Sequence, residues 1–484
     1  MKKRNPKSSA DATVVLHRVL PVWVCLILLA CPLSLANAGW EQVPKILSRI
    51  KAPQFPDKDF NITDYGAVGD GNTDCTEAFK KAISAASQAG GGRVVVPAGS
   101  FLTGAIHLKS NINLYVSQDA VIKFSTDPNA YLPAVYTRWE GIECMNYSPL
   151  IYAYKQKNIA ITGKGTLDGQ GKNWWQWKKF RDAPQALSKQ GQDGVPVKER
   201  QYGGKTLRPN MIEPYKCKNI LIEGVTIKNG PFWHIHPVLS QNITVRNVRV
   251  DGMGPNNDGC NPESCKDVLI EGCYFNTGDD CIAIKAGRNN DGRRVNVPSE
   301  NIVIRNCQMK AGHGGVVIGS ETTGGTRNVF AENCIMDDPN LDRVLRLKTN
   351  SVRGGFIENV YARNITVGQV KESILHIYYF YGEGDKGKFT PKVRNINVEN
   401  VTSKKSKYAL FLKGYERSPI TDVRLKNCTF DNIQDPNEVE ISQVKNLVLE
   451  NVKINGKLVK ADMLKSMHPQ AVQGLTKNSD DDNE

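Results

Sequence analysis

The feature that most constrains the fold is a short apolar segment, closed by asparagine or glycine, that recurs through the second half of the chain. In each copy, apolar residues occupy alternate positions, which predicts a β-strand that ends in a turn. A period in the twenties without helical patterns between the strands predicts an all-β parallel solenoid with coils stacked about 4.8 Å apart. The closing residues lie 23, 25, 34 and 27 positions apart, at Gly224, Asn247, Gly272, Asn306 and Asn333.

Several polar clusters lie within this repeat. Asp279 comes seven positions after Gly272, and His313 comes seven after Asn306, so the two residues hold equivalent positions on adjacent coils. Asp258 precedes Asp279 by about one coil. We therefore expect one shared face for the four clusters Asn256-Asn257-Asp258, Gly278-Asp279-Asp280, Gly312-His313-Gly314 and Arg346-Leu347-Lys348.

The alternation along the strands predicts which side chains point toward that face. Leucines alternate with Arg346 and Lys348, so these two cations should point outward while the leucines fill the interior. Asp280 has the parity of an inward residue, and it reaches the same face only if the backbone bends. Gly278 is the expected position of that bend.

Residues 1–38 have the features of a signal peptide, because basic residues precede an apolar run interrupted by prolines and then a small-residue cleavage site. A membrane anchor and a lipoprotein signal at Cys31 are the alternatives. We expect an exported protein, secreted or periplasmic, that does not contact a membrane after signal cleavage. The expected division is 1–38 signal peptide, 39–58 leader with little pattern, 59–460 solenoid and 461–484 partly disordered tail.

Residues 76–86 have a helical period, with Thr73 or Asp74 as the expected N-cap. A solenoid needs a capped end, so this helix should cover the first coil. Two stretches, 126–149 and 170–209, interrupt the repeat. Loops of this length in a regular scaffold are often functional. The second contains Trp174, Trp175 and Trp177, which could stack on sugar rings or be buried under the loop.

The cysteines do not indicate a metal site, and four of them favour an interior stack over a disulfide framework. Cys273, Cys307, Cys334 and Cys428 share one repeat position, which predicts an interior stack of small apolar residues. The pairing of the other six cysteines after residue 38 cannot be deduced. The sequence contains no Cys-x-x-Cys and no histidine cluster at metal-ligand spacing, so we expect no metal and no cofactor.

The chain is basic, with a formal charge of +14. Without residues 1–38, which carry five bases and Asp11, 58 basic and 48 acidic residues remain, a charge of +10. Such a protein can attract an acidic polymer, although a solvated basic surface explains the charge equally well. No pattern typical of nucleic-acid binding is present. The distribution of the basic residues is more informative than their number. Six of them are expected to flank the carboxylate face: Lys285, Arg288, Arg293, Arg294, Arg346 and Lys348.

Carboxylates grouped on one face suit acid–base hydrolysis of a glycosidic bond. One carboxyl must be protonated to donate to the leaving oxygen, and repulsion between neighbours raises the pKa of one of them. The others can activate water. Asp258, Asp279 and Asp280 could meet the spacing of about 6.5–9.5 Å that inverting enzymes use. Arg346 and Lys348 would hold a substrate carboxylate, and His313 could tune the acid.

The order Asn-x-Asp, Gly-Asp-Asp, Gly-His-Gly, Arg-x-Lys resembles the polygalacturonases of glycoside hydrolase family 28 from about Phe60 to Asn455. The resemblance implies a right-handed, single-stranded parallel β-helix that cleaves pectin with inversion. It implies Asp279 as general acid, Asp258 and Asp280 as the pair that activates water, and His313 as an active-site histidine. The implied substrate-binding residues are Asn256, Arg346, Lys348 and, on a loose match, Tyr381.

Two details bear on this resemblance. Asn257 stands where many members have threonine, a change that leaves the carboxylates untouched. His234 and His236 precede the first aspartate and are expected to be structural.

Arg138-Trp139-Glu140-Gly141 looks like the bacterial exo-acting branch, which implies loops that close one end of a cleft. The expected partner is an acidic polysaccharide or oligogalacturonide, and the expected state is a monomer. The alternatives are a rhamnogalacturonan or xylogalacturonan hydrolase, a calcium-dependent pectate lyase and a non-catalytic β-helix adhesin.

Overall fold

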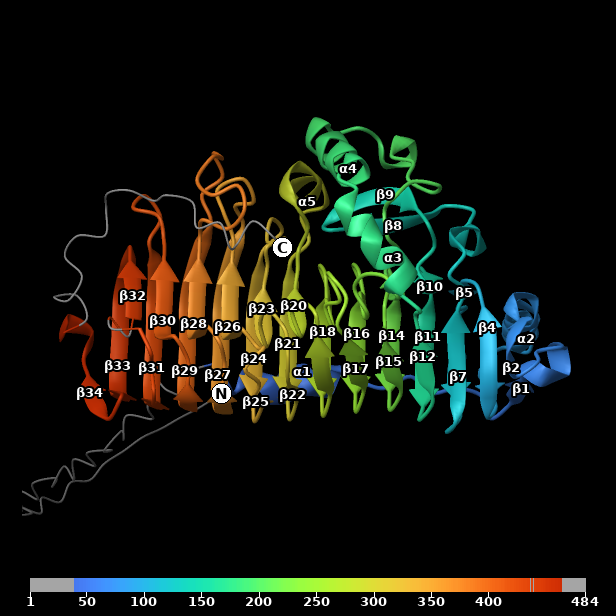
Figure 1. Ribbon diagram of the computed structural model, residues 1–484, viewed down its shortest axis with the longest axis horizontal. Helices are drawn as coiled ribbons and strands as arrows, with labels where there is room; N and C mark the ends of the chain where they lie inside the picture. Colours follow the sequence, from blue (N-terminus) through green and yellow to red (C-terminus); the bar gives the residue numbers. More distant parts are fainter. Residues whose placement is uncertain (1–38, 436, 438, 464–484) are drawn as a thin grey trace, which may run out of the picture. The chain divides into compact units, whose positions relative to one another are not determined.

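The computed structural model describes residues 39–435, 437 and 439–463. Successive coils lie side by side along the chain, and nearly all strand pairs are parallel (Figure 1). The expected parallel β-helix is confirmed. The signal peptide expected at 1–38 and most of the expected tail lie outside the described residues. Within the described part, no helix combines the length and apolar character needed to cross a bilayer.

The largest sheet of the described residues forms the long faces of the coil. Its strands are β1 (Asp59–Asn61), β2 (Asp70–Asp74), β3 (Gly92–Val96), β4 (Gly99–Thr103), β6 (Ile112–Val116), β7 (Ala120–Phe124), β11 (Lys157–Gly163), β12 (Thr166–Asp168), β14 (Lys218–Glu223), β15 (Thr226–Lys228), β16 (Gln241–Arg246), β17 (Arg249–Gly252), β18 (Lys266–Glu271), β19 (Tyr274–Thr277), β21 (Ser299–Arg305), β22 (Gln308–Met309), β24 (Thr326–Glu332), β25 (Ile335–Met336), β27 (Phe356–Gln369), β29 (Lys392–Lys405), β31 (Ile420–Phe430), β33 (Val444–Ile454) and β34 (Lys457–Val459).

The face that carries the polar clusters is built from two further parallel sheets, which isolated bridges through Ile235 and Cys260 connect. One contains β5 (Ile106–His107), β10 (Ile151–Tyr154) and β13 (Ile212–Tyr215); the other contains β20 (Ile282–Ile284), β23 (Val316–Ile318), β26 (Arg343–Lys348), β28 (Ser373–Tyr378), β30 (Tyr408–Lys413) and β32 (Val439–Ser442). An antiparallel hairpin, β8 (Val135–Trp139) and β9 (Ile142–Asn146), stands apart.

The closing residues of the repeat turn the chain because they adopt left-handed backbone conformations. Asn247, Asn306 and Asn333 have φ values of 52°, 56° and 54°, and Gly224 and Gly272 have 79° and 63°. Asparagine and glycine tolerate this region better than other residues do. The recurring asparagine or glycine in the sequence therefore marks the turns of the coil at which the backbone must adopt a left-handed conformation.

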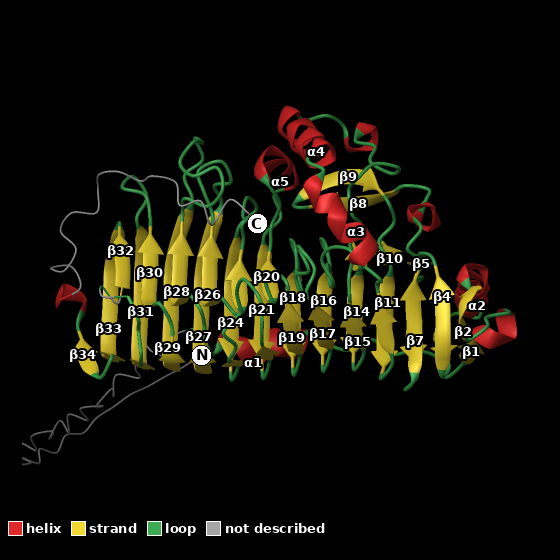
Figure 2. Ribbon diagram, viewed as in Figure 1, coloured by secondary structure: helices red, strands yellow, loops and turns green. Residues whose placement is uncertain are grey.

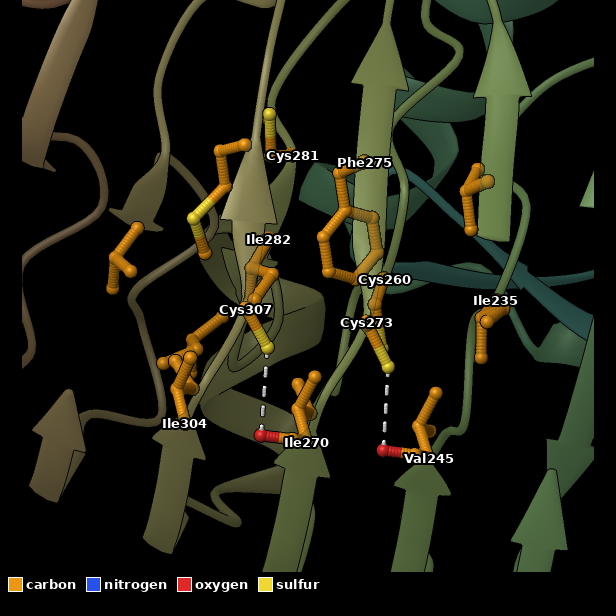
Figure 3. Packing of buried hydrophobic residues seen from close by; sticks show 14 of the residues in the cluster. Ile235, Val245, Cys260, Ile270, Cys273, Phe275, Cys281, Ile282, Ile304 and Cys307 are labelled. Carbon is orange, nitrogen blue, oxygen red and sulfur yellow. Dashed lines mark hydrogen bonds between the residues drawn. The ribbon is translucent and has the colours of Figure 1, made fainter. Parts of the chain in front are cut away.

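Stacked apolar residues fill the interior of the coil. Val245, Ile270 and Ile304 pair in register and are fully buried. Cys273 and Cys307 point their sulfurs toward the carbonyls of Val245 and Ile270, at 3.5 and 3.8 Å (Figure 3). All ten cysteines of the described residues are buried and free. The burial of the four at the shared repeat position agrees with the predicted interior stack.

Helix α2 covers one end of the coil, while α3, α4 and α5 lie above it and α1 lies along its lower part in the view of Figure 2. The predicted capping helix is α2, and Asp74 accepts from the backbone N–H of Thr76 although the N-cap residue itself is Cys75. The buried face of α2 includes Phe79 and Ile83, which belong to the main core. The helices are α1 (Gln42–Arg49), α2 (Thr76–Gln88), α3 (Lys172–Trp175), α4 (Asp182–Asp193), α5 (Asn289–Val295) and the 3-10 turns η2 (Ile62–Tyr65), η3 (Pro128–Tyr131), η4 (Gln176–Lys179) and η5 (Val197–Glu199).

The leader expected to have little pattern contains α1, which lies along the outside of the coil (Figure 1). Trp40 packs on Phe330 and Tyr361, with ring centroids 5.4 and 6.2 Å away. At its end, Arg49 forms an ion pair with Asp267 at 2.6 Å. The leader is thus attached to coils far from it in sequence.

Both interruptions of the repeat fold beside the face that carries the polar clusters. The first forms the β8–β9 hairpin, and the second forms α3, η4, α4 and η5 (Figure 2). Trp174 is buried against Tyr131 and Tyr147, with ring centroids 5.6 and 6.1 Å away. Of the two expected roles for this tryptophan, burial under the loop is the correct one.

Candidate active site

Neighbouring strands β20, β23 and β26 position the site. They pair in parallel, with Ala283, Val317 and Arg346 in one row. Just before these strands, the backbone N–H of His313 donates to the carbonyl of Asp279 at 3.1 Å. The two residues therefore lie in register on adjacent coils, as their spacing predicts.

Asp280 joins the same face because the strand is interrupted before it. β19 ends at Thr277 and β20 begins at Ile282, and the chain bends at Gly278 between them. A Cβ at Gly278 would lie 2.4 Å from the carbonyl oxygen of Gly254, so glycine also allows a close approach of two coils. The bend expected at this glycine is present.

The three aspartates form one compact group, in which oxygens of Asp258, Asp279 and Asp280 all lie within 4.8 Å of one another. These closest oxygens therefore lie nearer to one another than the expected spacing of about 6.5–9.5 Å. Alternation predicts the face of a side chain but not how far it leans toward its neighbours. Such a group could also hold a metal ion, because three carboxylates converge on one point.

Lysines and one arginine supply positive charge around the group. Lys348 Nζ lies 3.0 Å and Arg346 Nη1 lies 3.6 Å from the Asp280 carboxylate. Lys285 Nζ lies 3.6 Å from Asp258 and 3.1 Å from Glu321. The negative charge of the aspartates is therefore largely balanced by side chains of this chain.

The group binds a proton more tightly than isolated aspartates would. Burial raises the pKa of Asp258 well above its usual range, and the charge of Asp279 raises it further, while Lys285 opposes both effects. One proton bound among three close carboxylates relieves their mutual repulsion. The site can thus supply a proton at a pH where an exposed aspartate could not.

Asp279 has partners that the other two aspartates lack. His313 Nδ1 lies 3.1 Å from Asp279 Oδ1, and the imidazole is 31% exposed. Asn256 Nδ2 lies 3.5 Å from Asp279 Oδ2, and Asn256 in turn accepts from Arg208 at 2.6 Å. Arg208 was not predicted from the sequence, because no repeat position connects it with the first motif.

The predicted substrate cations lie deeper than expected. Arg346 is only 1% exposed and Lys348 3% exposed, and Lys348 but not Arg346 lines the cleft. The ring of Tyr381 lies beside both cations, 5.7 Å from the Arg346 guanidinium and 5.0 Å from Lys348 Nζ. The loose match at Tyr381 thus corresponds to a residue at the site.

Two of the basic residues expected beside the carboxylates lie elsewhere. Arg293 donates to the carbonyls of Val352 and Arg353, and Arg294 pairs with Glu143 and Asp291. Both arginines lie in the last turn of helix α5, which points them away from the carboxylates although they are close to them in sequence. Lys285 and Arg288 do reach the cleft.

The two histidines of the preceding segment are structural, as expected. His234 accepts from the backbone N–H of Gly230 and lies 2.9 Å from the carbonyl of Asp258. His236 lies between Glu213 and Glu263, at 3.3 and 2.8 Å. Both imidazoles are fully buried, so they hold neighbouring coils together and do not face substrate.

The cleft above the aspartates has a volume of about 540 Å³, which is in the range of small-ligand sites. Its walls come from both interruptions of the repeat and from the loop after β28. The side chains that sequence reasoning did not place there include Glu321, Arg353 and Glu383. Its charged lining residues are Glu140, Lys178, Arg181, Asp258, Asp279, Asp280, Lys285, Arg288, Glu321, Lys348, Arg353, Glu383 and Lys386.

The sequence matches the family model described as glycosyl hydrolases family 28 over residues 87–455. This chain belongs to glycosyl hydrolase family 28. It is therefore a glycoside hydrolase, and the resemblance seen in its motifs is confirmed.

Relatives and solved structures agree with this family. A probable polygalacturonase of Vitis vinifera is 32% identical over 386 residues, 76% of this chain and 73% of the relative. An exo-poly-alpha-D-galacturonosidase of Dickeya chrysanthemi is 29% identical over 83% of this chain and 75% of its own length. A solved exopolygalacturonase of Thermotoga maritima, described as hyperthermoactive, is 44% identical with a TM-score of 0.83, covering 87% of this chain and 97% of that one.

Proposed function

We propose that this family 28 hydrolase cleaves the α-1,4-galacturonosyl bonds of pectin and polygalacturonate from chain ends, with inversion. The observation that supports this best is the group of three aspartates in a cleft rich in lysine and arginine. Carboxylates supply the acid and base for glycosidic hydrolysis, and the cations suit a polymer with a carboxylate on each sugar. Similarity to exopolygalacturonases supports the same substrate and the same cleavage from chain ends.

Asp279 is the proposed general acid. It is the aspartate in contact with His313 and Asn256, and it is more exposed than Asp258 and Asp280. Its proton passes to the leaving oxygen as the glycosidic bond breaks. His313 orients the carboxyl through its 3.1 Å contact and affects its proton affinity.

Asp258 and Asp280 are the proposed pair that activates water. Asn261 donates to Asp258 at 2.8 Å, and Lys348 and Arg346 neutralise Asp280, so both carboxylates are fixed in position. Because their closest oxygens lie within 4.8 Å, a water can bridge the two and lose its proton to one of them as it attacks the sugar. Attack from the face opposite the leaving group inverts the anomeric carbon.

Lys348, Tyr381 and Asn256 line the cleft and are the proposed substrate contacts. Arg346 is buried beneath them, and we propose that it acts through Asp280 and the Tyr381 ring. The walls from residues 126–149 and 170–209 are the proposed cause of chain-end action. We further propose that the chain is exported and works as a monomer.

Digestion of trigalacturonate, followed by proton NMR, tests this proposal. We expect galacturonate monomer as the first product, with an anomeric signal opposite in configuration to the cleaved bond. A mixture of internal fragments from polygalacturonate would contradict the chain-end mode, and retained configuration would contradict the water-activating pair. An unsaturated product would show a lyase, and turnover only on branched pectin would show a rhamnogalacturonan or xylogalacturonan hydrolase.

A further inference from the structure

Most cations of the cleft have carboxylate partners within it. Arg288 pairs with Glu140 at 3.0 Å, and Arg353 pairs with Glu383 at 2.7 Å. Lys285 and Lys348 pair with the aspartate group and Glu321. Because these side chains partly balance each other's charge, a ligand carboxylate meets less than a full positive charge at each of them.

Arg181 and Lys386 are different. Both line the cleft, both are exposed, and neither has a carboxylate within ion-pair distance among the described residues. They come from separate segments, because Arg181 lies just before α4 and Lys386 lies in the loop after β28. Two positive charges without a carboxylate partner in the described part of the chain therefore line one cleft from two separate segments.

These two segments flank the aspartates along the coil. The strand order β20-β23-β26-β28 places the loop with Lys386 beyond the strands that carry the site. The segment with Arg181 lies toward the earlier coils, where α4 packs against β9 and α5 (Figure 1). A substrate chain along the coil axis, with its terminal sugar at the wall of residues 170–209, would therefore have one cation on each side of the aspartates.

We propose that Arg181 and Lys386 bind the carboxylates of sugars on the two sides of the catalytic group. This inference rests on the proposed function and adds to it two substrate-binding residues that lie outside the repeat. A guanidinium can hold a carboxylate through two parallel hydrogen bonds, and an ammonium acts as a point charge. Because such contacts persist in the transition state, they should affect substrate binding more than the chemical step.

The chain offers matched controls for both positions. Lys179 lies two residues before Arg181, and Lys388 two residues after Lys386; both are exposed and neither lines the cleft. Substitution of these lysines removes the same charge from the same segment. The comparison thus separates a direct contact from the general field of a basic protein.

The experiment measures KM and kcat on trigalacturonate for wild type, Arg181→Gln, Lys386→Gln, Lys179→Gln and Lys388→Gln. We expect each cleft variant to raise KM by about tenfold with kcat nearly unchanged, as for loss of a charged hydrogen bond. We expect the increase to shrink in high salt, which screens exposed charges. The two controls should stay within about twofold of wild type.

Three results would overturn the inference: cleft variants no different from the controls, a fall in kcat at constant KM, or an increase in KM that salt leaves unchanged. Wild type without activity on trigalacturonate would contradict the proposed function instead. In that case, calorimetric binding of trigalacturonate in an Asp279→Asn background still compares the cleft variants with the controls. Equal affinities there would overturn the inference independently.

Discussion

Asp258 is the residue at which the demands of catalysis and stability conflict most directly. It is buried beside another carboxylate, and its ionised form is therefore unfavourable in the folded protein. The folded state binds a proton here more tightly than the unfolded chain, where an aspartate has a pKa of about 3.9. Stability from this residue is complete below that pKa and is lost as pH rises through the raised folded pKa.

The variant Asp258→Asn should melt a few degrees higher than wild type at pH 7, because it removes a buried charge while its side-chain oxygen still accepts from Asn261. The difference should narrow toward pH 4, where the aspartate is protonated in the folded protein and about half protonated in the unfolded chain. Thermal melts across this pH range measure it. Asp57→Asn, at an exposed position, is the control. Equal shifts at pH 4 and pH 7 would show that the charge is not responsible.

Activity is not expected to depend on a metal ion bound by the aspartates. The aspartate group could ligate a cation, but Lys285 and Lys348 already stand 3.6 and 3.0 Å from its oxygens. Positive charge from these lysines competes with a bound ion. We expect turnover on polygalacturonate to be unchanged after dialysis against EDTA. Loss of activity that calcium restores would contradict this account and favour a lyase.

At the scale of elements, the leader illustrates what the sequence could not reveal. The apolar residues Trp40, Val43 and Ile46 fit a short helix, but their partners Phe330 and Tyr361 lie about 300 residues further along the chain. The same holds for α3 and α4, which were predicted only as interruptions of the repeat. Periodicity reports which face of an element is apolar, and it does not report which distant element covers that face.

The variant Trp40→Ala should lower stability by about 3 kcal/mol, as typical for truncation of a buried tryptophan. The side chain also stacks against Arg363, whose guanidinium lies 3.8 Å from the ring centroid. Chemical denaturation measures the change, and Lys45→Ala, exposed on α1, is the control. We expect kcat to be unaffected in native conditions, since the leader packs on the large sheet and not on the strands of the site. A large loss of kcat without loss of stability would contradict this assignment.

At the scale of the whole molecule, the repeat made the fold and the grouping of the candidate side chains predictable. The coil period placed Asp279 beside His313, and alternation placed Arg346 and Lys348 on the same face. The depth of Arg346 and the 4.8 Å grouping of the aspartates were not predictable, because they depend on side-chain tilt and on the ion pairs of Asp280. The cleft walls were not predictable either, since they join segments that lie outside the repeat.

The proposed mechanism depends on three aspartates that adjacent coils bring together to hydrolyse a polyuronate. The most direct measurement is the release of reducing ends from polygalacturonate by wild type and by Asp279→Asn, together with calorimetric binding of trigalacturonate to the variant. We expect the variant to lose turnover by at least about 100-fold, as for removal of a general acid, while its affinity changes little. Wild-type turnover in Asp279→Asn would contradict the account.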